Sequence, residues 1–295
     1  MVRAEIIATE FFDQPPTSIE ALLGLGSVNE IFIAQRGEKH IVVRLPKPED
    51  RERAGAFYEK ERWCLEQAAS LGVPGPLVLQ LGICDSWPFQ IQSFVVGVNG
   101  EQSNLDPIVF WQTLGDYARR FHKIPLTGFG ENLAEFFTLK GRTRWLEFIN
   151  YNLNSLTPED PLLALGVYES SQRDQIHAHF TEVRQRPFHL GLCHGDLAPR
   201  NTIVAPDGTL VLLDWGCAEA HLVPHYDLLH IPGEHRTAFL DGYGWPLSER
   251  AALLAEVENL ALLKSFDLVR WALDRCPARI TELAEKARVQ AQSVA

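Results

Sequence analysis

Apolar residues recur at helical spacing in one early segment of the chain. The stretch from about Asp50 to Ser70 predicts a helix, because its apolar positions fall on a single stripe. Besides one acid, that stripe holds Phe57, Cys64, Leu65 and Ala68. The acid is Glu61, and a carboxylate on a buried stripe needs a partner. Glu61 is therefore expected to pair with a cation, whereas Glu59 is expected to face solvent.

Helical spacing returns after residue 100. Asp106-Pro107 forms a cap and first-turn pair, and the apolar positions after it predict a helix. These positions are Trp111, Leu114, Ala118 and Phe121. A long helix is expected from Ala251 to Asp274, because Leu254, Val257, Leu260, Leu263 and Val269 recur at helical spacing. Pro277 stops it, and a last helix is expected over about 278–290.

Strand patterns lie on either side of the first helix. His40–Leu45 alternates so that Arg44 shares a face with Val42. Pro88–Gly97 predicts a buried strand that leaves into a connector. A charged residue on such a strand is a candidate partner for Glu61.

A short hairpin is predicted near residue 207. Thr202–Val204 and Thr209–Leu213 read as two strands around Asp207-Gly208, a favoured two-residue loop. That loop would set Asn201 directly opposite Asp214, with the two side chains about 5 Å apart on one face. Pro206 is able to widen the turn to four residues, which would loosen this spacing and keep the strands paired.

Three polar side chains are expected to meet at this hairpin. Asp196 lies five residues before Asn201 and so near Asp214 as well. Amide and carboxylate oxygens at this separation suit Mg²⁺ that bridges nucleotide phosphates. The alternative is that Asp196 caps a turn, Asn201 closes it and Asp214 ends a solvated strand. That alternative is better for any one residue, but the whole set favours the metal site.

The motif from His194 to Asp214 resembles that of the aminoglycoside phosphotransferase and choline kinase-like family, relatives of the protein kinases. The shared pattern is His-Gly-Asp, four residues, Asn, and an apolar strand that ends in Asp. The resemblance implies that Asp196 is the catalytic base and that Asn201 and Asp214 hold Mg²⁺. It implies that His194 braces the loop. Asp227 would pin the same loop through hydrogen bonds, or act as a helix N-cap, which is compatible with that role.

Upstream residues extend the resemblance. The Gly24–Asn29 segment is similar to the glycine-containing hairpin that covers the phosphates, with Gly26 and Ser27 as candidate contacts. Arg44 stands where the family usually has a phosphate-binding Lys, and its pair with Glu61 would reproduce the family's ion pair. Gln92, Ser93 and Phe94 would form the hinge that holds adenine. ATP is expected by default, since the sequence does not separate it from GTP.

The resemblance implies an α+β, bilobal protein-kinase-like fold. Residues 1–94 would form a nucleotide-binding lobe with a small antiparallel sheet and one main helix. Residues 95–295 would form a larger, mostly helical lobe with the catalytic loop and the substrate site. A length of 295 residues suits two unequal lobes.

Composition excludes several classes. No apolar run approaches a membrane span and the first residues lack a signal-peptide core, so a cytoplasmic protein is expected. Five cysteines without CxxC spacing suggest reduced core residues. A net charge of −11 argues against a nucleic-acid partner. It mildly favours a cationic substrate, although acidity for solubility is the stronger explanation.

Further candidates are less specific. His221, His225, His230 and His235 could suggest zinc, but Pro224 interrupts the helical spacing and no Cys or Glu supports it. Loop and rim positions beside the cleft are favoured instead, and His122 is expected to be a core histidine. Acceptor choice is expected in residues 128–185 and 234–245. Candidates there are Trp145, Glu147, Glu159, Asp160, Asp241 and Trp245, each of which also reads as an ordinary surface or core residue.

The expected activity is transfer of the γ-phosphoryl group from Mg-ATP to a hydroxyl of a small molecule. An aminoglycoside-like or other cationic acceptor, choline and homoserine stay open, as do a resistance or metabolic role and the oligomeric state. A protein kinase is disfavoured, because twelve residues between Asp214 and Asp227 leave little room for an activation segment. A catalytically silent nucleotide-binding module is disfavoured, because such a protein has no need to retain all the residues that catalysis requires. These residues are Arg44, Glu61, Asp196, Asn201 and Asp214.

Overall fold

The computed structural model describes residues 1–22, 28–126, 130 and 141–294. The chain forms two compact units. The first combines Met1–Thr113 with Asp196–Ala218, and the second combines Leu114–Gly195 with Glu219–Ala295. A division of labour at residue 94 stays a prediction, because these units group residues by contact and not by function.

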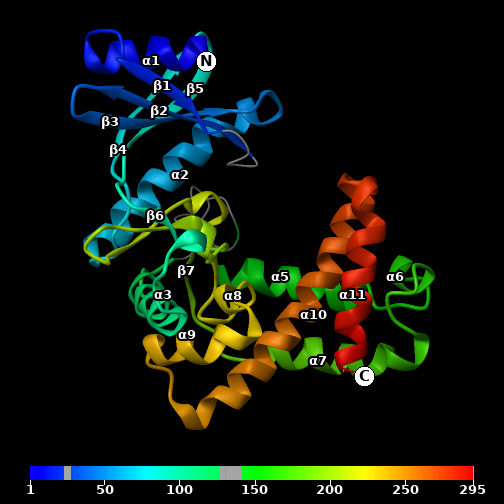
Figure 1. Ribbon diagram of the computed structural model, residues 1–295. Helices are drawn as coiled ribbons and strands as arrows, with labels where there is room; N and C mark the ends of the chain where they lie inside the picture. The colour runs from blue at the N-terminus through cyan, green and yellow to red at the C-terminus, as the bar shows by residue number, and fades with distance from the viewer. Residues whose placement is uncertain (23–27, 127–129, 131–140, 295) are drawn as a thin grey trace. The chain divides into compact units, whose positions relative to one another are not determined.

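The first unit contains a five-stranded antiparallel sheet in the order β1-β2-β3-β5-β4 (Figure 1). Its strands are β1 (Ser18–Ala21), β2 (Asn29–Arg36), β3 (Lys39–Pro46), β4 (Val78–Cys84) and β5 (Trp87–Ser93). Two helices belong to it, α1 (Val2–Phe12) and α2 (Arg51–Ser70). The sheet and the main helix after β3 are as predicted.

Alternation along β3 divides its side chains between two helices. Ile41, Val43 and Leu45 belong to the apolar cluster that includes Ala4 and Ile7 of α1. Successive side chains of a strand point to opposite faces, so Arg44 points away from α1. The two helices lie on opposite sides of the sheet (Figure 1), which leaves Arg44 on the side of α2.

The predicted stripe of α2 is mostly confirmed. Glu61, Cys64, Leu65 and Ala68 are buried, whereas Phe57 is half-buried and Glu59 is exposed. The stripe faces the interior because apolar side chains at three- and four-residue spacing share one helical face.

A smaller sheet completes the first unit. β6 (Val98–Asn99), β8 (Thr202–Val204) and β9 (Leu210–Leu212) pair in the order β6-β8-β9. Segments far apart in sequence are thus hydrogen-bonded, since Val98 pairs with Val204. This sheet brings the residues around Asn201 and Asp214 into the same unit as β3 and α2.

The predicted register of the β8–β9 hairpin is wrong by one residue. Thr202 pairs with Leu212, and the amide of Leu213 donates to the carbonyl of Asn201 at 2.8 Å, so Asn201 faces Leu213 and not Asp214. The cause is a longer turn, in which the amide of Ala205 donates to the carbonyl of Thr209 at 2.9 Å.

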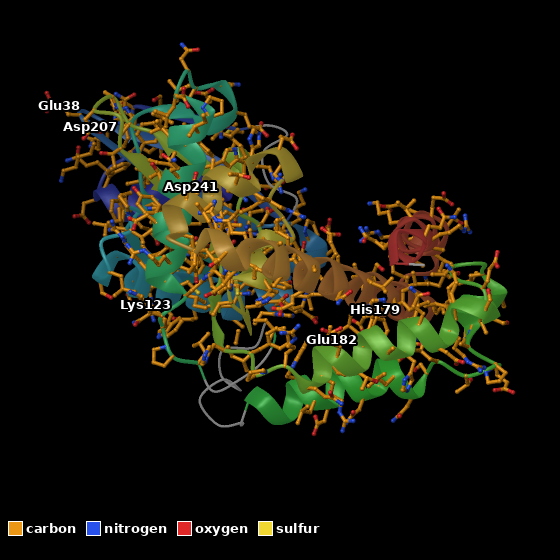
Figure 2. All side chains as sticks on the ribbon, turned by 90° about the horizontal axis from the view of Figure 1, so that it is seen from below. Glu38, Lys123, His179, Glu182, Asp207 and Asp241 are labelled. Atoms are coloured by element: carbon orange, nitrogen blue, oxygen red, sulfur yellow. The ribbon has the colours of Figure 1, made fainter. Side chains whose placement is uncertain are left out.

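Three residues, 206–208, therefore connect the strands, and Gly208 takes a φ of 85°. A three-residue loop of this kind needs a left-handed residue, which Gly supplies. Asp207 lies in this exposed turn (Figure 2), where its carboxylate accepts from the amide of Thr209 at 2.9 Å.

The second unit is mainly helical (Figure 1). Its helices are α3 (Pro107–Phe121), whose first residues belong to the first unit, α5 (Gly141–Asn154), α6 (Pro161–Ala164), α7 (Arg173–Gln185), α8 (His225–Leu228), α9 (Arg236–Tyr243), α10 (Arg250–Arg275) and α11 (Ile280–Val294). Two strands, β7 (Leu190–Cys193) and β10 (Glu219–Leu222), form an antiparallel ribbon. Short 3-10 turns occur in the second unit at Ser170–Gln172, Gly233–His235, Leu247–Glu249 and Pro277–Arg279, and in the first unit at Pro48–Asp50, Gly100–Gln102, Pro199–Asn201 and Trp215–Cys217.

The core of the second unit forms around α10. Val257, Leu260, Leu263 and Val269 are fully or almost fully buried, as their spacing predicted, whereas Leu254 is half-buried. Pro277 begins a 3-10 turn, after which α11 starts. Within the described residues, no helix is long and apolar enough to cross a bilayer.

A buried ion pair crosses this core. Arg270 of α10 donates to Asp160 at 2.7 Å and to the amide oxygen of Asn152 at 2.9 Å. Asp160 also accepts from the hydroxyl of Tyr168 at 2.9 Å and from the amide of Leu162. Asp160, a sequence candidate for acceptor binding, is therefore a core residue that caps α6.

Candidate functional site

Arg44 and Glu61 form a buried ion pair. One guanidinium nitrogen of Arg44 lies 2.6 and 2.5 Å from the two carboxylate oxygens of Glu61, and both side chains are less than 10% exposed. The side chain of Gln90 on β5 accepts a further hydrogen bond from Arg44 at 3.2 Å. The predicted pairing of the strand cation with the helix acid is confirmed.

The same guanidinium reaches the end of the β8–β9 hairpin. Its other terminal nitrogen lies 3.5 Å from a carboxylate oxygen of Asp214. Burial lowers the pKa of the Arg44 guanidinium, but the charges of Glu61 and Asp214 raise it more and the net shift is upward. Arg44 is thus a fixed cation between two acids.

Asp214 is the accessible member of this group. Its side chain is 49% exposed, and its backbone is left-handed, with φ 55° and ψ 73°. The carboxylate accepts from the amide of Gly216 at 3.4 Å and so caps the turn Trp215–Cys217. One carboxylate therefore stays open to solvent beside a buried cation.

Asn201 is oriented by Asp196. The side-chain nitrogen of Asn201 donates to the carbonyl of Asp196 at 2.9 Å and to its carboxylate at 2.8 Å. Arg200 donates to the other carboxylate oxygen of Asp196. Because the Asn201 nitrogen donates to both oxygens, the amide oxygen of the same side chain faces away from Asp196. The side chain of Arg200 is 56% exposed although it is paired with Asp196.

Asp227 holds the backbone just before Asp196. Its carboxylate accepts from the amides of His194 at 3.0 Å and Gly195 at 2.8 Å, and from the ring of His122 at 2.9 Å. Burial raises the pKa of Asp227, but the hydrogen bond and charge of His122, with the other donors, lower it more. The expected hydrogen bonds to the loop are present. The N-cap of α8 is Pro224, so the N-cap alternative is not observed.

His122 and His194 are both buried. The second ring nitrogen of His122 lies 3.1 Å from the hydroxyl of Tyr243. The prediction of a satisfied core histidine at position 122 is therefore confirmed. The bracing role of His194 stays a prediction.

The candidate nucleotide contacts are partly described. Gly26 and Ser27 lie outside the described residues. Gln92 is buried and donates to Gln90 at 3.0 Å, whereas Ser93 accepts from the amide of Leu77 at 2.9 Å. Phe94 packs on His40, with ring centroids 5.4 Å apart. The side chains of Gln92 and Ser93 thus already make hydrogen bonds within the protein. If these residues hold adenine, their backbone groups would have to do so.

One buried residue near this group was missed. Lys60 of α2 is 4% exposed, and its ammonium donates to the carbonyls of Gly216 at 2.7 Å and Ala218 at 3.0 Å. Its position, three residues after Phe57 and four before Cys64, is on the predicted stripe. This helical spacing was the sequence signal from which the burial of Lys60 could have been predicted.

The expectation of loop and rim positions is wrong for two of the four histidines. His221 and His225 are buried: His221 accepts from the amide of Leu222 and stacks on Tyr226, whose ring centroid lies 4.0 Å away. His225 lies 2.9 Å from Glu256. Within the described part of the chain, one group is close enough to share a metal ion, namely His122, Cys193 and Asp227. Asp227 already accepts hydrogen bonds in this group, and none of the four histidines at positions 221, 225, 230 and 235 belongs to it.

The other acceptor candidates divide between core and surface. Trp145 is buried, and Asp241 pairs with Arg250 at 2.7 Å. Glu147 and Glu159 are exposed. None of these positions singles out an acceptor.

The donor set suits a hard divalent cation. Asp214 offers an accessible carboxylate and Asn201 an amide oxygen turned away from Asp196. Oxygen ligands of this kind are those that Mg²⁺ prefers, and it usually takes few of them from the protein. The residues present therefore fit Mg²⁺ bound together with a nucleotide.

The fold is similar to those of solved phosphotransferases. A thermostable mutant of aminoglycoside phosphotransferase APH(4)-Ia, in ternary complex with AMP-PNP and hygromycin B, is 17% identical over 99% of both chains, with a TM-score of 0.67. The GDP and kanamycin complex of APH(2")-IIia is 16% identical over 98% of both chains, with a TM-score of 0.66. Choline kinase LicA from Streptococcus pneumoniae is 16% identical over 98% of this chain and 99% of its own, with a TM-score of 0.60.

Sequence comparison adds a family. The family model described as "Phosphotransferase enzyme family" (APH) matches residues 21–276. No curated protein sequence matches the chain. The matched range includes β2 to β5, the hairpin and most of the helices of the second unit.

Proposed function

The chain belongs to the phosphotransferase enzyme family, and from this premise we propose that it transfers the γ-phosphoryl group of Mg-ATP to a hydroxyl group of a small molecule. The observation that carries the proposal is the grouping of two acids, an amide and a fixed cation in the first unit. These residues are Arg44, Glu61, Asn201 and Asp214, with Asp196 beside Asn201.

Asp196 is proposed as the catalytic base. Its carboxylate is held by Asn201 and Arg200, which fixes its direction. It would orient the acceptor hydroxyl and accept its proton as the oxygen bonds to phosphorus and ADP leaves. His194 and Asp227 would support this loop through the backbone.

Asn201 and Asp214 are proposed as the Mg²⁺ ligands. The bound ion would neutralise phosphate charge and fix the position of the transferred group. Arg44 would add a positive charge for the phosphates, and Glu61 would keep it in place. Most of the rate enhancement would come from positioning and charge neutralisation.

Nucleotide binding is proposed for residues 1–94, and acceptor binding for residues 95–295. Gly26 and Ser27 would contact phosphates, and the backbone of Gln92, Ser93 and Phe94 would hold the base. ATP is the proposed donor. GTP is the competing donor to test, since one similar structure holds AMP-PNP and another holds GDP.

Acceptor identity is proposed as a class only. Hydroxylated cations, such as aminoglycosides and choline-like amino alcohols, are the first candidates because similar folds bind kanamycin, hygromycin B or act on choline. A cytoplasmic location is part of the proposal, because ATP is available there and the cysteines are free thiols.

The test is nucleotide turnover across an acceptor panel. ADP and GDP release would be measured with Mg²⁺, each donor, and aminoglycosides, macrolides, choline, homoserine or hydroxylated metabolites. The control is Asp196→Asn, which keeps the size of the side chain and removes the base. An acceptor-dependent signal that this variant lacks supports the proposal. Turnover that is equal in both proteins contradicts the role of Asp196.

A further inference from the structure

Lys60 is a buried lysine whose resolved hydrogen bonds go to backbone carbonyls. Lysine is almost never fully buried without a partner, yet this side chain is 4% exposed. Its ammonium donates to the carbonyls of Gly216 and Ala218 at 2.7 and 3.0 Å. The ring centroid of Phe57 lies 5.1 Å from the same nitrogen. The two carbonyl groups therefore stabilise the buried ammonium, and they do so only while the backbone of Gly216 and Ala218 keeps its position.

Both carbonyls belong to the segment that follows Asp214. Gly216 lies inside the 3-10 turn Trp215–Cys217 and Ala218 is its C-cap. The amide of Gly216 donates to Asp214 at 3.4 Å, and the carbonyl of the same residue accepts from Lys60. Gly216 is thus held from both sides, by the acid that precedes it and by the cation on α2.

A second connection joins α2 to Asp214. Glu61, the next residue along the helix, holds Arg44, and Arg44 lies 3.5 Å from Asp214. Helix α2 is therefore linked to Asp214 in two ways. Glu61 holds Arg44, which reaches the Asp214 side chain, and Lys60 holds the backbone of the turn that follows Asp214. Two independent links fix the direction of a carboxylate better than one.

The backbone of Asp214 needs such support. A left-handed φ of 55° is uncommon for a residue other than glycine, and it persists where the surroundings fix it. We infer that Lys60 is a positioning residue, which anchors the turn after Asp214 to α2 and thereby aims the Asp214 carboxylate at Mg²⁺. This inference rests on the proposed role of Asp214 as a metal ligand.

The test is how AMP-PNP binding depends on the Mg²⁺ concentration. Binding is measured by calorimetry in the absence of any acceptor. Groups that orient a metal ligand typically change metal affinity or activity by about 10- to 100-fold. We therefore expect Lys60→Met to raise the Mg²⁺ concentration for half-maximal binding by about tenfold or more. Lys60→Arg keeps a cation at this place, and a smaller shift is expected. The matched control is Lys39→Met at the exposed start of β3, which should leave the Mg²⁺ dependence unchanged.

Each outcome decides between a positioning role and a structural one. A folded Lys60→Met protein with the Mg²⁺ dependence of the unsubstituted protein overturns the inference. If that variant does not fold, Lys60→Gln is measured in the same way, with the same expected shift. Loss of folding in both variants assigns Lys60 to the core alone and also overturns it. If the unsubstituted protein binds AMP-PNP without any need for Mg²⁺, the proposed metal site itself fails, which is a separate result.

Discussion

Arg44 and Glu61 meet through a single guanidinium nitrogen that contacts both carboxylate oxygens. This buried contact joins β3 to α2, and each charge compensates for the burial of the other. Removing one member of such a pair leaves an unpaired charge in the interior and costs about 3–5 kcal/mol. Replacing both members by apolar side chains is often far less costly.

Glu61→Leu alone is expected to lower the free energy of unfolding by about 3 kcal/mol. Arg44→Met alone should lower it by a similar amount, because Glu61 is then left in the interior without Arg44. The double variant should be more stable than Glu61→Leu but should bind ATP more weakly than the unsubstituted protein. Urea unfolding measures the first effect and calorimetry the second. Additive losses in the double variant would contradict the idea of a coupled pair.

Asp227→Asn tests the support of the loop before Asp196. Asparagine has the same shape, but its nitrogen cannot accept from the amides of His194 and Gly195. We expect a loss of about 2–4 kcal/mol in unfolding free energy. Turnover should fall by at least about tenfold because a misplaced catalytic group is costly. The control is ATP affinity, which should stay within a factor of about two.

The buried His221 predicts a pH dependence of stability. Burial, and then the charges of Lys264, His225 and His230, hold the pKa of the imidazole well below its usual value. The hydrogen bond from the amide of Leu222 also favours a neutral ring. Between the folded pKa and the unfolded value of about 6.5, the unfolded chain binds more protons. The free energy of unfolding should therefore fall as the pH drops below about 6.5.

Urea unfolding at pH 7, 6 and 5 measures this effect. One such group contributes a slope of up to about 1.4 kcal/mol per pH unit. His221→Gln lacks the titrating ring, so its stability should fall less steeply, even if it starts lower. Equal slopes in both proteins would assign the acid sensitivity to other groups, such as His225, whose pKa burial also lowers.

Two helical glycines should respond in opposite ways to the same substitution. A Cβ on Gly115 of α3 would lie 2.0 Å from the carbonyl oxygen of Phe239 and 2.8 Å from the amide of Tyr243. Gly115→Ala is expected to cost about 1–3 kcal/mol, or more, because backbone has to move. Gly55 of α2 has nothing within 4 Å of that position, so Gly55→Ala should stabilise the protein by about 0.5–1 kcal/mol. Thermal unfolding of both variants, measured side by side, tests the contrast.

The spacing of apolar residues and the order of the motifs along the chain predicted most of the architecture. The helix over 51–70, the helix with Trp111 and Phe121, and the long helix before Pro277 all follow from apolar spacing, because each buries one face. The family was predicted from the motif around His194 to Asp214 and is confirmed by the family match. The roles of the individual site residues stay predictions.

Local geometry was harder to predict. The hairpin register depended on one turn residue, and the chain uses Gly208 in a three-residue turn where Asp207-Gly208 also suits a two-residue one. Lys60 was missed because a lysine is expected in solvent, and its partners are carbonyls, which no sequence pattern reveals. His221 and His225 were assigned to a rim once a zinc site was rejected, but both are buried. Their contacts come from distant segments, because Trp145 packs on His221 and Glu256 lies 2.9 Å from His225.

The first unit draws on two stretches of chain that residues 114–195 separate. During synthesis, β1 to β5 and α2 leave the ribosome before the residues that pair with β6 or accept from Lys60 have been made. Residues 94–218 are still to be made when β5 is complete, and at typical elongation rates of about 5–20 residues per second this takes about 6–25 seconds. Throughout that time the ammonium of Lys60 lacks its carbonyl partners and the Arg44–Glu61 pair lacks Asp214. Newly made N-terminal chain is thus expected to stay incompletely packed, and to be a substrate for chaperones, until residue 218 has emerged.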